Sequence, residues 1–204
     1  MHCILVTGIP ASGKSTMAAY LAKELGIPMF SKDAIKERLF DTLGFNSREE
    51  KVRLGVAAME IMYDAARSCF SGGQSVILEN NFEDSSRKGL SALFAEYACD
   101  VITVQMTGDL REIYNRFAAR DQSPQRHRGH VVNDCYPEKP GGERTHTTIP
   151  YEVFARSAIG RGMERLPWDG SCIRVDTTDV SRIDNAGVAA QIRAFMRKDK
   201  AEEQ

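Results

Sequence analysis

The sequence lacks several features that would each point to a particular class of protein. Its five cysteines include no C-x-x-C pair, which argues against a zinc site and a disulfide framework and favours the reduced cytoplasm. No apolar run approaches the roughly 20 residues of a membrane-spanning helix, and no basic segment precedes the first apolar run. The formal net charge is only -1, so the bulk charge gives no attraction to nucleic acid or to an anionic membrane. We therefore expect a cytoplasmic protein without a membrane segment.

The remaining composition is that of an ordinary globular protein. Hydrophobic residues make up 42% and charged residues 27% of the 204 positions. A chain of this length suits one α/β domain with room for an inserted segment, but not a second large core. We predict a single domain over residues 1–197 and a flexible tail over residues 198–204.

Short apolar runs alternate along the chain with longer segments of helical periodicity, which is typical of βαβ units and a parallel sheet. The runs that predict strands are residues 3–7, 28–30, 76–78, 101–106 and 172–175. The segments between them predict helices.

Two of the predicted helices have apolar stripes that define an expected buried face. The helix after the second strand would bury residues spaced by four: Ile35, Leu39 and Leu43. A long helix follows Ser47 and Glu50, which form a capping box. Its expected stripe is Val52, Val56, Met59, Tyr63, Ala66 and Phe70.

Between residues 118 and 149 the apolar periodicity fails. This segment carries glycine, proline and many basic residues instead of a core-facing stripe. A structureless stretch of this length inside a compact domain is unusual without a function, so we predict a lid or functional loop here. A helix is expected to begin again at Pro150.

The most specific feature follows the first predicted strand. It fits the phosphate-binding pattern G-x-x-x-x-G-K-[ST], with one more hydroxyl at Thr16: Gly8, Ile9, Pro10, Ala11, Ser12, Gly13, Lys14 and Ser15. Such glycines let backbone N–H groups face a phosphate, and the helix N-terminus adds partial positive charge. Lys14 would contact the β- and γ-phosphates, and Ser15 would bind Mg²⁺. Because a chance match has a probability of about one percent, we predict that ATP and Mg²⁺ bind here.

Phosphoryl transfer requires further groups, and two acids are placed to supply them. Asp33 follows the second strand at the carboxyl edge of the predicted sheet, where it could orient and deprotonate an acceptor hydroxyl. Alternatively, Asp33 is the N-cap of the helix that starts near Ala34. Glu79 ends the third strand, where an acid can act on Mg²⁺ or its waters. Asn80 beside it could contact the acceptor or only turn the chain.

Basic side chains supply the remaining requirement, because cations must offset charge on the transferring phosphate. Arg116 and Arg120 lie four residues apart on a predicted helix, and Arg126 follows them. We predict Arg120 and Arg126 for this role, with solvated surface charge as the alternative. Lys36 could hold the acceptor or face solvent.

His127 and His130 have an i, i+3 spacing that two metal ligands can have. No cysteine and no third histidine accompanies them in a helical frame, so a role as ordinary side chains is favoured over a metal site.

Three segments together resemble a known family: VTGIPASGKST, SKDAIKERLFDTLG and SVILENNF. They are similar to the AAA_33, or zeta-toxin-like, family of small P-loop kinases, and to the kinase domain of phage polynucleotide kinase. Zeta toxins, gluconate kinase and chloramphenicol phosphotransferase are more distant relatives. The resemblance implies a three-layer α/β fold with a five-stranded parallel sheet in the order 2-3-1-4-5, helices on both faces and a lid insertion.

The resemblance also implies roles for individual residues. The acid after the second strand, here Asp33, orients the acceptor hydroxyl in such kinases, and the loop after the last strand lies near adenine, which implicates Asp176 and Thr177. In the polynucleotide kinase pattern an arginine contacts substrate three residues after that acid. The corresponding residue here is Lys36, which weakens a polynucleotide assignment.

The main alternative to a kinase is an ATP-hydrolysing switch or an ATPase that makes no phosphorylated product. A GTPase is disfavoured because N-K-x-D is absent and because D-x-x-G occurs only as Asp41 to Gly44, at a predicted helix end. As the acceptor we expect a small molecule, with a nucleic-acid 5′-hydroxyl as the second candidate.

Overall fold

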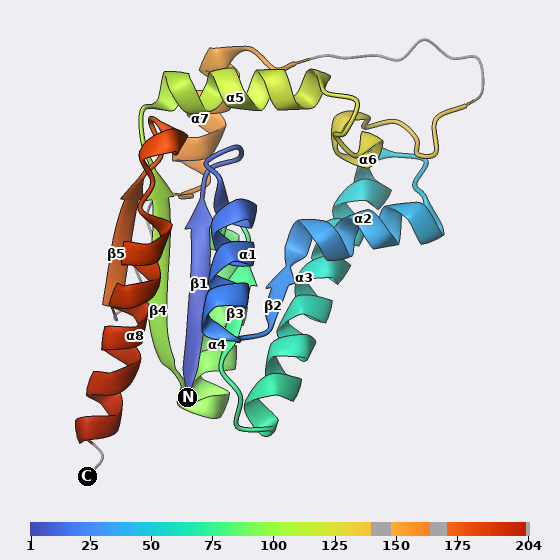
Figure 1. Ribbon diagram of the computed structural model, residues 1–204. Coiled ribbons are helices and arrows are strands. Elements are labelled where there is room, and N and C mark those ends of the chain that lie inside the picture. The colour runs from blue at the N-terminus through green and yellow to red at the C-terminus, as the bar shows by residue number, and fades with distance from the viewer. Residues whose placement is uncertain (140–147, 164–170, 203–204) are drawn as a thin grey trace.

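The computed structural model describes residues 1–139, 148–163 and 171–202, with side chains up to Arg197 (Figure 1). The described residues contain a five-stranded, all-parallel sheet in the order β2-β3-β1-β4-β5. Its strands are β1 (His2–Gly8), β2 (Met29–Ser31), β3 (Val76–Glu79), β4 (Asp100–Thr107) and β5 (Ser171–Asp176). This confirms the predicted α/β fold and strand order, with small shifts at the strand ends.

The central strand β1 shows why the fold has three layers. Every residue of β1 is buried, as expected for a parallel strand that is covered on both faces. Cys3 and Leu5 pack into one core with helices α3 (Arg48–Ser71) and α4 (Arg87–Tyr97). Ile4 and Val6 pack into the other core with α1 (Lys14–Leu25) and α8 (Asn185–Glu202). The alternation of side chains along β1 thus places helices on both faces.

A third core lies beyond the carboxyl end of β1. Helix α5 (Leu110–Gln122) and helix α7 (Tyr151–Gly160, with Pro150 as its N-cap) pack together there, and Figure 1 shows α5 crossing the end of the sheet. Their buried side chains Ile113 and Phe154 surround Ile9 of the P-loop. This core therefore fixes the loop from the side opposite to the sheet.

The C-terminal helix is longer than the sequence indicates. Helix α8 continues to Glu202, over most of the segment predicted to be a tail. No helix among the described residues is long and apolar enough to cross a membrane.

The predicted stripe of α3 is wrong in its first half. Val52 is 53% exposed and Val56 is 58% exposed, whereas Gly55 and Ala58 are buried. The reason is that this part of α3 packs against α2 (Lys32–Leu43) rather than against the sheet, so a different side of the helix is covered. For the same reason α2 buries Phe40 and leaves Leu43 67% exposed, contrary to its predicted stripe.

The predicted loop at residues 118–149 has more structure than its sequence suggests. Helix α5 continues to Gln122, helix α6 spans Arg128–Val131, and Tyr136 forms an antiparallel bridge with Phe45. Val132 completes a small core with Phe40 and Phe45. These partners lie far apart along the chain, so periodicity within the segment cannot reveal them. Residues 140–147 lie outside the described residues.

Lys51 of α3 connects this segment to the domain. Its side chain is 8% exposed, and its ammonium donates hydrogen bonds to the backbone oxygens of His130 (3.0 Å) and Val132 (2.5 Å) and to Oδ1 of Asn133 (3.1 Å). One buried side chain thus satisfies three acceptors on the segment that follows α5.

Replacing Lys51 by methionine keeps the side-chain length and removes these donors. Each buried acceptor left without a partner costs about 1–3 kcal/mol, so we expect residues 127–138 to open more often while the sheet is unchanged. Hydrogen exchange should become at least about tenfold faster in that segment. Lys23→Met, at an exposed position of α1, is the matched control. Equal protection in wild type and Lys51→Met would mean that the aromatic core alone holds the segment.

Candidate active site

The P-loop has the backbone conformation that a phosphate cradle requires. Positive φ angles occur at Gly8 (144°), Ala11 (67°) and Gly13 (89°). A Cβ on Gly8 would lie 2.3 Å from the carbonyl oxygen of Met106, so only glycine allows this approach to β4. Gly13 caps α1 without a side-chain hydrogen bond, and the first turn of α1 contains no acid. The backbone N–H groups of that turn are therefore available to an anion.

Lys14 lies within the loop. Its side chain is 7% exposed, and Nζ donates a hydrogen bond to the carbonyl oxygen of Ile9 at 2.8 Å. Burial lowers the pKa of Lys14 to about 8, against the opposing effect of Glu79 and Asp33. Ser12 contributes a buried Oγ that has no hydrogen-bond partner among the described residues. The Lys14 ammonium and the Ser12 hydroxyl both fit a site for phosphate oxygens, because neither donor is bound to an anionic acceptor in the described part of the chain.

Glu79 and Ser15 form the group that fits Mg²⁺. Glu79 is 4% exposed at the end of β3, and the hydroxyl of Ser31 donates to its Oε2 at 2.6 Å. Burial raises the pKa of Glu79, while Lys14 and hydrogen bonds from Ser31 and Ser15 oppose that shift. Mg²⁺ prefers oxygen ligands and usually keeps several waters, so one hydroxyl and one carboxylate beside a nucleotide suffice.

Asp33 is not the cap of its helix. Ser31 is the N-cap of α2 and its hydroxyl accepts a hydrogen bond from the backbone N–H of Ala34 at 3.4 Å. The capping alternative for Asp33 is therefore wrong, and its carboxylate is available for other contacts. Partial desolvation would raise the pKa of Asp33, but His130 and Lys36, followed by further cations, hold it below its usual value. Asp33 is thus ionised at neutral pH.

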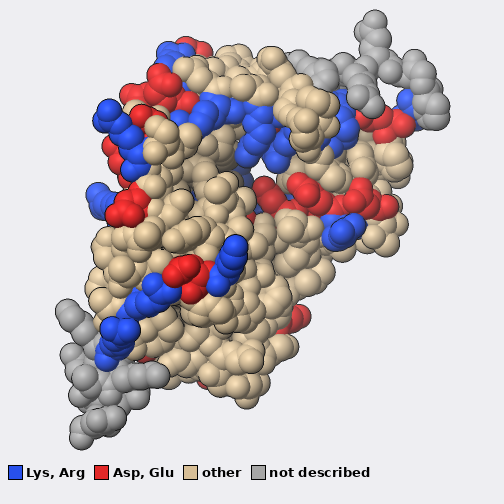
Figure 2. Space-filling model, in the orientation of Figure 1, with Lys and Arg blue, Asp and Glu red and all other residues tan. Residues whose placement is uncertain are grey.

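Arg120 and Arg126 lie over this cluster. Their Nε atoms are 3.9 Å and 3.4 Å from Oδ1 of Asp121, and neither Nε makes a hydrogen bond within the described residues. Burial and Arg126 lower the pKa of Arg120, and both arginines lie close enough to Lys14 to lower its pKa further. Figure 2 shows the hollow between α5 and α2, with Lys and Arg on the α5 side and Asp and Glu along α2.

Arg116 connects two loops that the sequence does not relate. Its Nε donates to the carbonyl oxygen of Ala11 at 3.3 Å, and Nη1 donates to the carbonyl oxygen of Thr178 at 3.1 Å. Arg116 thus joins the P-loop to the loop after β5. Sequence reasoning places Arg116 only in a cationic cluster, because its partners are 105 and 62 residues away along the chain.

Replacing Arg116 by glutamine is expected to weaken ATP binding about tenfold, since hydrogen bonds from a charged donor contribute about 1.5–3 kcal/mol. Titration with ATP by calorimetry measures this change. Arg182→Gln, at a position whose side chain is 85% exposed near the same loop, is the control. Wild-type affinity in Arg116→Gln would mean that the two loops hold their positions without the guanidinium.

The other predicted residues lie at the same edge of the sheet or beside it. Asp176 is exposed and accepts a hydrogen bond from the backbone N–H of Thr178 at 2.8 Å. Thr177 is buried, and its hydroxyl donates to the carbonyl oxygen of Thr107 at 2.9 Å. Asn80 is buried, with its amide nitrogen 3.9 Å from Sδ of Met59. A direct contact of the Asn80 side chain with an acceptor stays a prediction.

The two histidines pair with acids of α2 instead of with each other. His127 Nε2 is 3.0 Å from Oδ1 of Asp41, and His130 Nε2 is 2.9 Å from Oε1 of Glu37. Over the described parts of the chain, no three His, Cys, Asp or Glu side chains are grouped as metal ligands. These contacts dock α6 onto α2.

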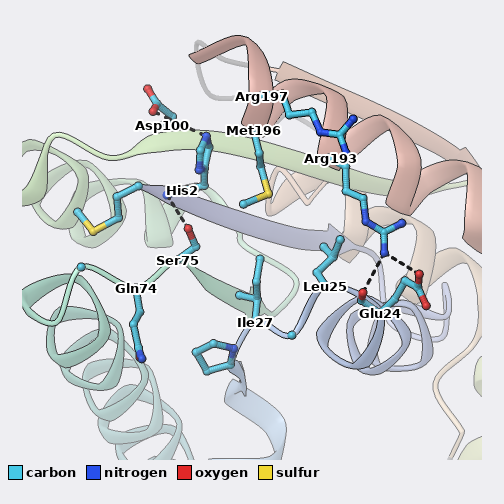
Figure 3. Close-up of a pocket in the computed structure, with 14 residues that line it drawn as sticks. His2, Glu24, Leu25, Ile27, Gln74, Ser75, Asp100, Arg193, Met196 and Arg197 are labelled. Carbon is cyan, nitrogen blue, oxygen red and sulfur yellow. Dashed lines mark hydrogen bonds and ion pairs between the residues drawn. The ribbon is translucent and has the colours of Figure 1, made fainter. Parts of the chain in front are cut away.

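A separate hollow of 620 Å³ lies at the opposite edge of the sheet (Figure 3). The amino ends of the strands reach it at His2 and Asp100, and Figure 3 shows Arg193 turned to Glu24, with Nη2 2.6 Å from Oε1. Because the P-loop, Asp33 and Glu79 all lie at the carboxyl ends of strands or just after them, this hollow is not part of the candidate active site.

Comparisons with known proteins agree with this geometry. The family model AAA_33, described as an AAA domain, matches residues 3–134. No curated protein matches the chain. A solved structure from Chloroflexus aurantiacus J-10-fl, described as a presumed kinase, is 29% identical, with a TM-score of 0.79 over 95% of this chain and 97% of that chain.

Two more distant solved structures show the fold alone. A sugar kinase from Janibacter sp. HTCC2649 is 15% identical, with a TM-score of 0.55, 96% of this chain covered and 94% of that chain. A gluconokinase from Sinorhizobium meliloti 1021 is 14% identical, with a TM-score of 0.54, 98% of this chain covered and 97% of that chain.

Proposed function

The chain belongs to the AAA_33 family of AAA domains, and from this premise we propose that it is a P-loop kinase that transfers the γ-phosphate of ATP to a hydroxyl of a small acceptor, with Mg²⁺. The observation that carries the proposal is the convergence of Lys14, Asp33 and Glu79, which influence one another electrostatically at one edge of the sheet. Structures described as kinases share the fold over nearly the whole chain, which supports the same reading.

The proposed reaction assigns a task to each group. The backbone of residues 8–15 and the ammonium of Lys14 bind the β- and γ-phosphates. Ser15 and Glu79 are the groups that would hold Mg²⁺, which neutralises charge on the phosphate oxygens when it is bound. Arg120 and Arg126 offset the charge that develops on the transferring phosphoryl group.

Asp33 acts on the acceptor. It orients the hydroxyl, whose oxygen forms a bond to the γ-phosphorus as the bond from that phosphorus to the β–γ bridging oxygen breaks. ADP leaves, and the hydroxyl proton passes to the Asp33 carboxylate. The low pKa of Asp33 keeps it ionised and ready to accept a hydrogen bond from the hydroxyl.

An acceptor screen tests the proposal. The protein is incubated with Mg²⁺ and γ-labelled ATP, with and without a library of hydroxyl-bearing metabolites and a 5′-hydroxyl oligonucleotide. A labelled product whose formation requires both the acceptor and wild-type Lys14 supports a kinase. Label that appears only as inorganic phosphate, at a rate that no acceptor changes, would support the alternative of an ATP-hydrolysing switch.

A further inference from the structure

A pocket of 370 Å³ opens beside the P-loop, between α3, α6 and α7. Pro10 and His130 line it on the side of the candidate active site. Its charged lining is one-sided, because the described residues around it include four Lys or Arg side chains and no Asp or Glu: Lys36, Arg48, Lys51 and Arg161. A volume of this size accommodates a small molecule rather than a polymer. We call it the cationic pocket.

Most of these cations already have partners. Lys51 donates to three oxygen atoms of residues 130–133, Arg48 donates to Asn133 Oδ1 at 3.2 Å, and Arg161 pairs with Glu83. Lys36 differs, because it makes no hydrogen bond and no ion pair among the described residues. Its Nζ lies over the ring of Phe40, 5.3 Å from the ring centroid.

The surroundings of Lys36 compensate its charge only in part. Burial lowers the pKa of Lys36, Asp33 opposes this, and Lys32, Arg126 and Arg161 lower it further. A half-buried ammonium among like charges is costly, and an anion placed beside it would relieve that cost.

The side chain of Lys36 lies beside the neighbouring helix α3. A Cβ on Gly55 of α3 would lie 3.4 Å from Cε and 3.7 Å from Nζ of Lys36, which is ordinary van der Waals contact, so the lysine side chain lies against α3.

Lys36 is also placed to act together with Asp33. The two residues are three apart on α2, so they are neighbours on the surface of that helix. A ligand that presents a hydroxyl to Asp33 can therefore reach Lys36 with a second group only a few bonds away. Val52 and Phe154, which also line the pocket, would contact the carbon skeleton between the two groups.

We propose that the acceptor is a small hydroxylated molecule with an anionic group, either a carboxylate or a phosphate monoester, which Lys36 binds in the cationic pocket while the hydroxyl lies at Asp33. This inference rests on the proposed kinase function and specifies its substrate class. The anionic group orients the acceptor and is not itself phosphorylated.

Binding to the nucleotide-loaded protein tests the substrate class separately from catalysis. The protein is saturated with Mg²⁺ and a non-hydrolysable ATP analogue, so that the P-loop is filled before the acceptor is added. Calorimetry then compares matched probes: glucose, gluconate and glucose 6-phosphate in one set, and glycerol, glycerate and glycerol 3-phosphate in another. We expect at least one anionic probe to bind about tenfold or more tightly than its neutral partner.

Variants assign that preference to Lys36. Lys36→Gln should remove the preference for the anion, and Lys36→Arg should keep most of it because the charge remains. Lys88→Gln is the control, since Lys88 is exposed and lines a neighbouring hollow of 680 Å³ but not the cationic pocket. Circular dichroism confirms that each variant is folded.

The outcomes separate the substrate class from the kinase function. If no anionic probe binds more tightly than its neutral partner, or if Lys36→Gln keeps the preference, the substrate class is wrong even when phosphate transfer occurs. Tighter binding of a 5′-hydroxyl oligonucleotide than of every small anion also overturns it. If a Lys36-dependent anion preference exists but no acceptor is phosphorylated, the kinase function fails and the anion site stands.

Discussion

Replacing Lys14 by alanine is expected to reduce phosphate transfer by at least about 10²–10³-fold, the usual effect of removing one preorganised donor from the transition state. Lys14 is buried within the P-loop, and its ammonium donates a hydrogen bond to the carbonyl oxygen of Ile9. The ammonium is thus held where the β- and γ-phosphates would bind. Steady-state kinetics with ATP and Mg²⁺ measure the loss.

The fold should survive this substitution. Glu79, the buried acid whose pKa Lys14 lowers, keeps its hydrogen bond from Ser31 after the substitution, so thermal unfolding of Lys14→Ala should stay within a few degrees of wild type. Lys23→Ala, at an exposed position near the other end of α1, should behave as wild type in both measurements. A folded Lys14→Ala protein with wild-type turnover would contradict the assignment of the P-loop.

Replacing Asp33 by asparagine is expected to lower turnover by about 10²–10⁴-fold, the usual contribution of a positioned general base, with little change in ATP affinity. Asparagine keeps the size of the side chain and cannot accept the proton. The capping of α2 should be preserved, because Ser31 rather than Asp33 supplies the N-cap hydroxyl. The effect should therefore appear mainly in kcat and only weakly in the midpoint of thermal unfolding.

Ser31→Ala provides the complementary measurement. Loss of an N-cap hydroxyl costs about 0.5–2 kcal/mol of stability, and this change also removes the hydrogen bond to Glu79. It should lower the free energy of unfolding by more than Asp33→Asn does, since Asp33→Asn removes only the attraction of nearby cations to its carboxylate. Turnover of Asp33→Asn within about threefold of wild type would exclude Asp33 as the base, and Glu79 would become the next candidate.

The sequence alone could not show whether Ser31 or Asp33 is the N-cap of α2. Ser31 and Asp33 are both strong N-cap residue types, and they lie two positions apart. Residue type alone cannot decide which of the two caps the helix, because the position of the N-cap depends on where β2 ends. Pairing of Ser31 with Glu79 extends β2 to that residue, so the helix starts at Lys32 and Asp33 is released from capping.

The register of α3 could not be predicted for a related reason. Apolar spacing identifies a helix but not its neighbour, and Val52 and Val56 satisfy the spacing equally well whether they are buried or exposed. The packing of α2 on one side of α3 decides that Gly55 and Ala58 are covered. The exposed valines are thus available to line pockets beside Lys36.

The sequence by itself determined the α/β class, the P-loop and the likeness to small kinases, because these depend on patterns within a few consecutive residues. Only the tertiary structure decided that Arg116 joins two loops, that Lys51 fixes residues 130–133, and that Lys36 lies against Gly55. Each of these depends on residues distant along the chain, which no local pattern connects. The surroundings of each side chain then set its pKa and its contacts. A lysine in solvent and a lysine held between two helices are the same residue in the sequence, and they differ only in the groups around them.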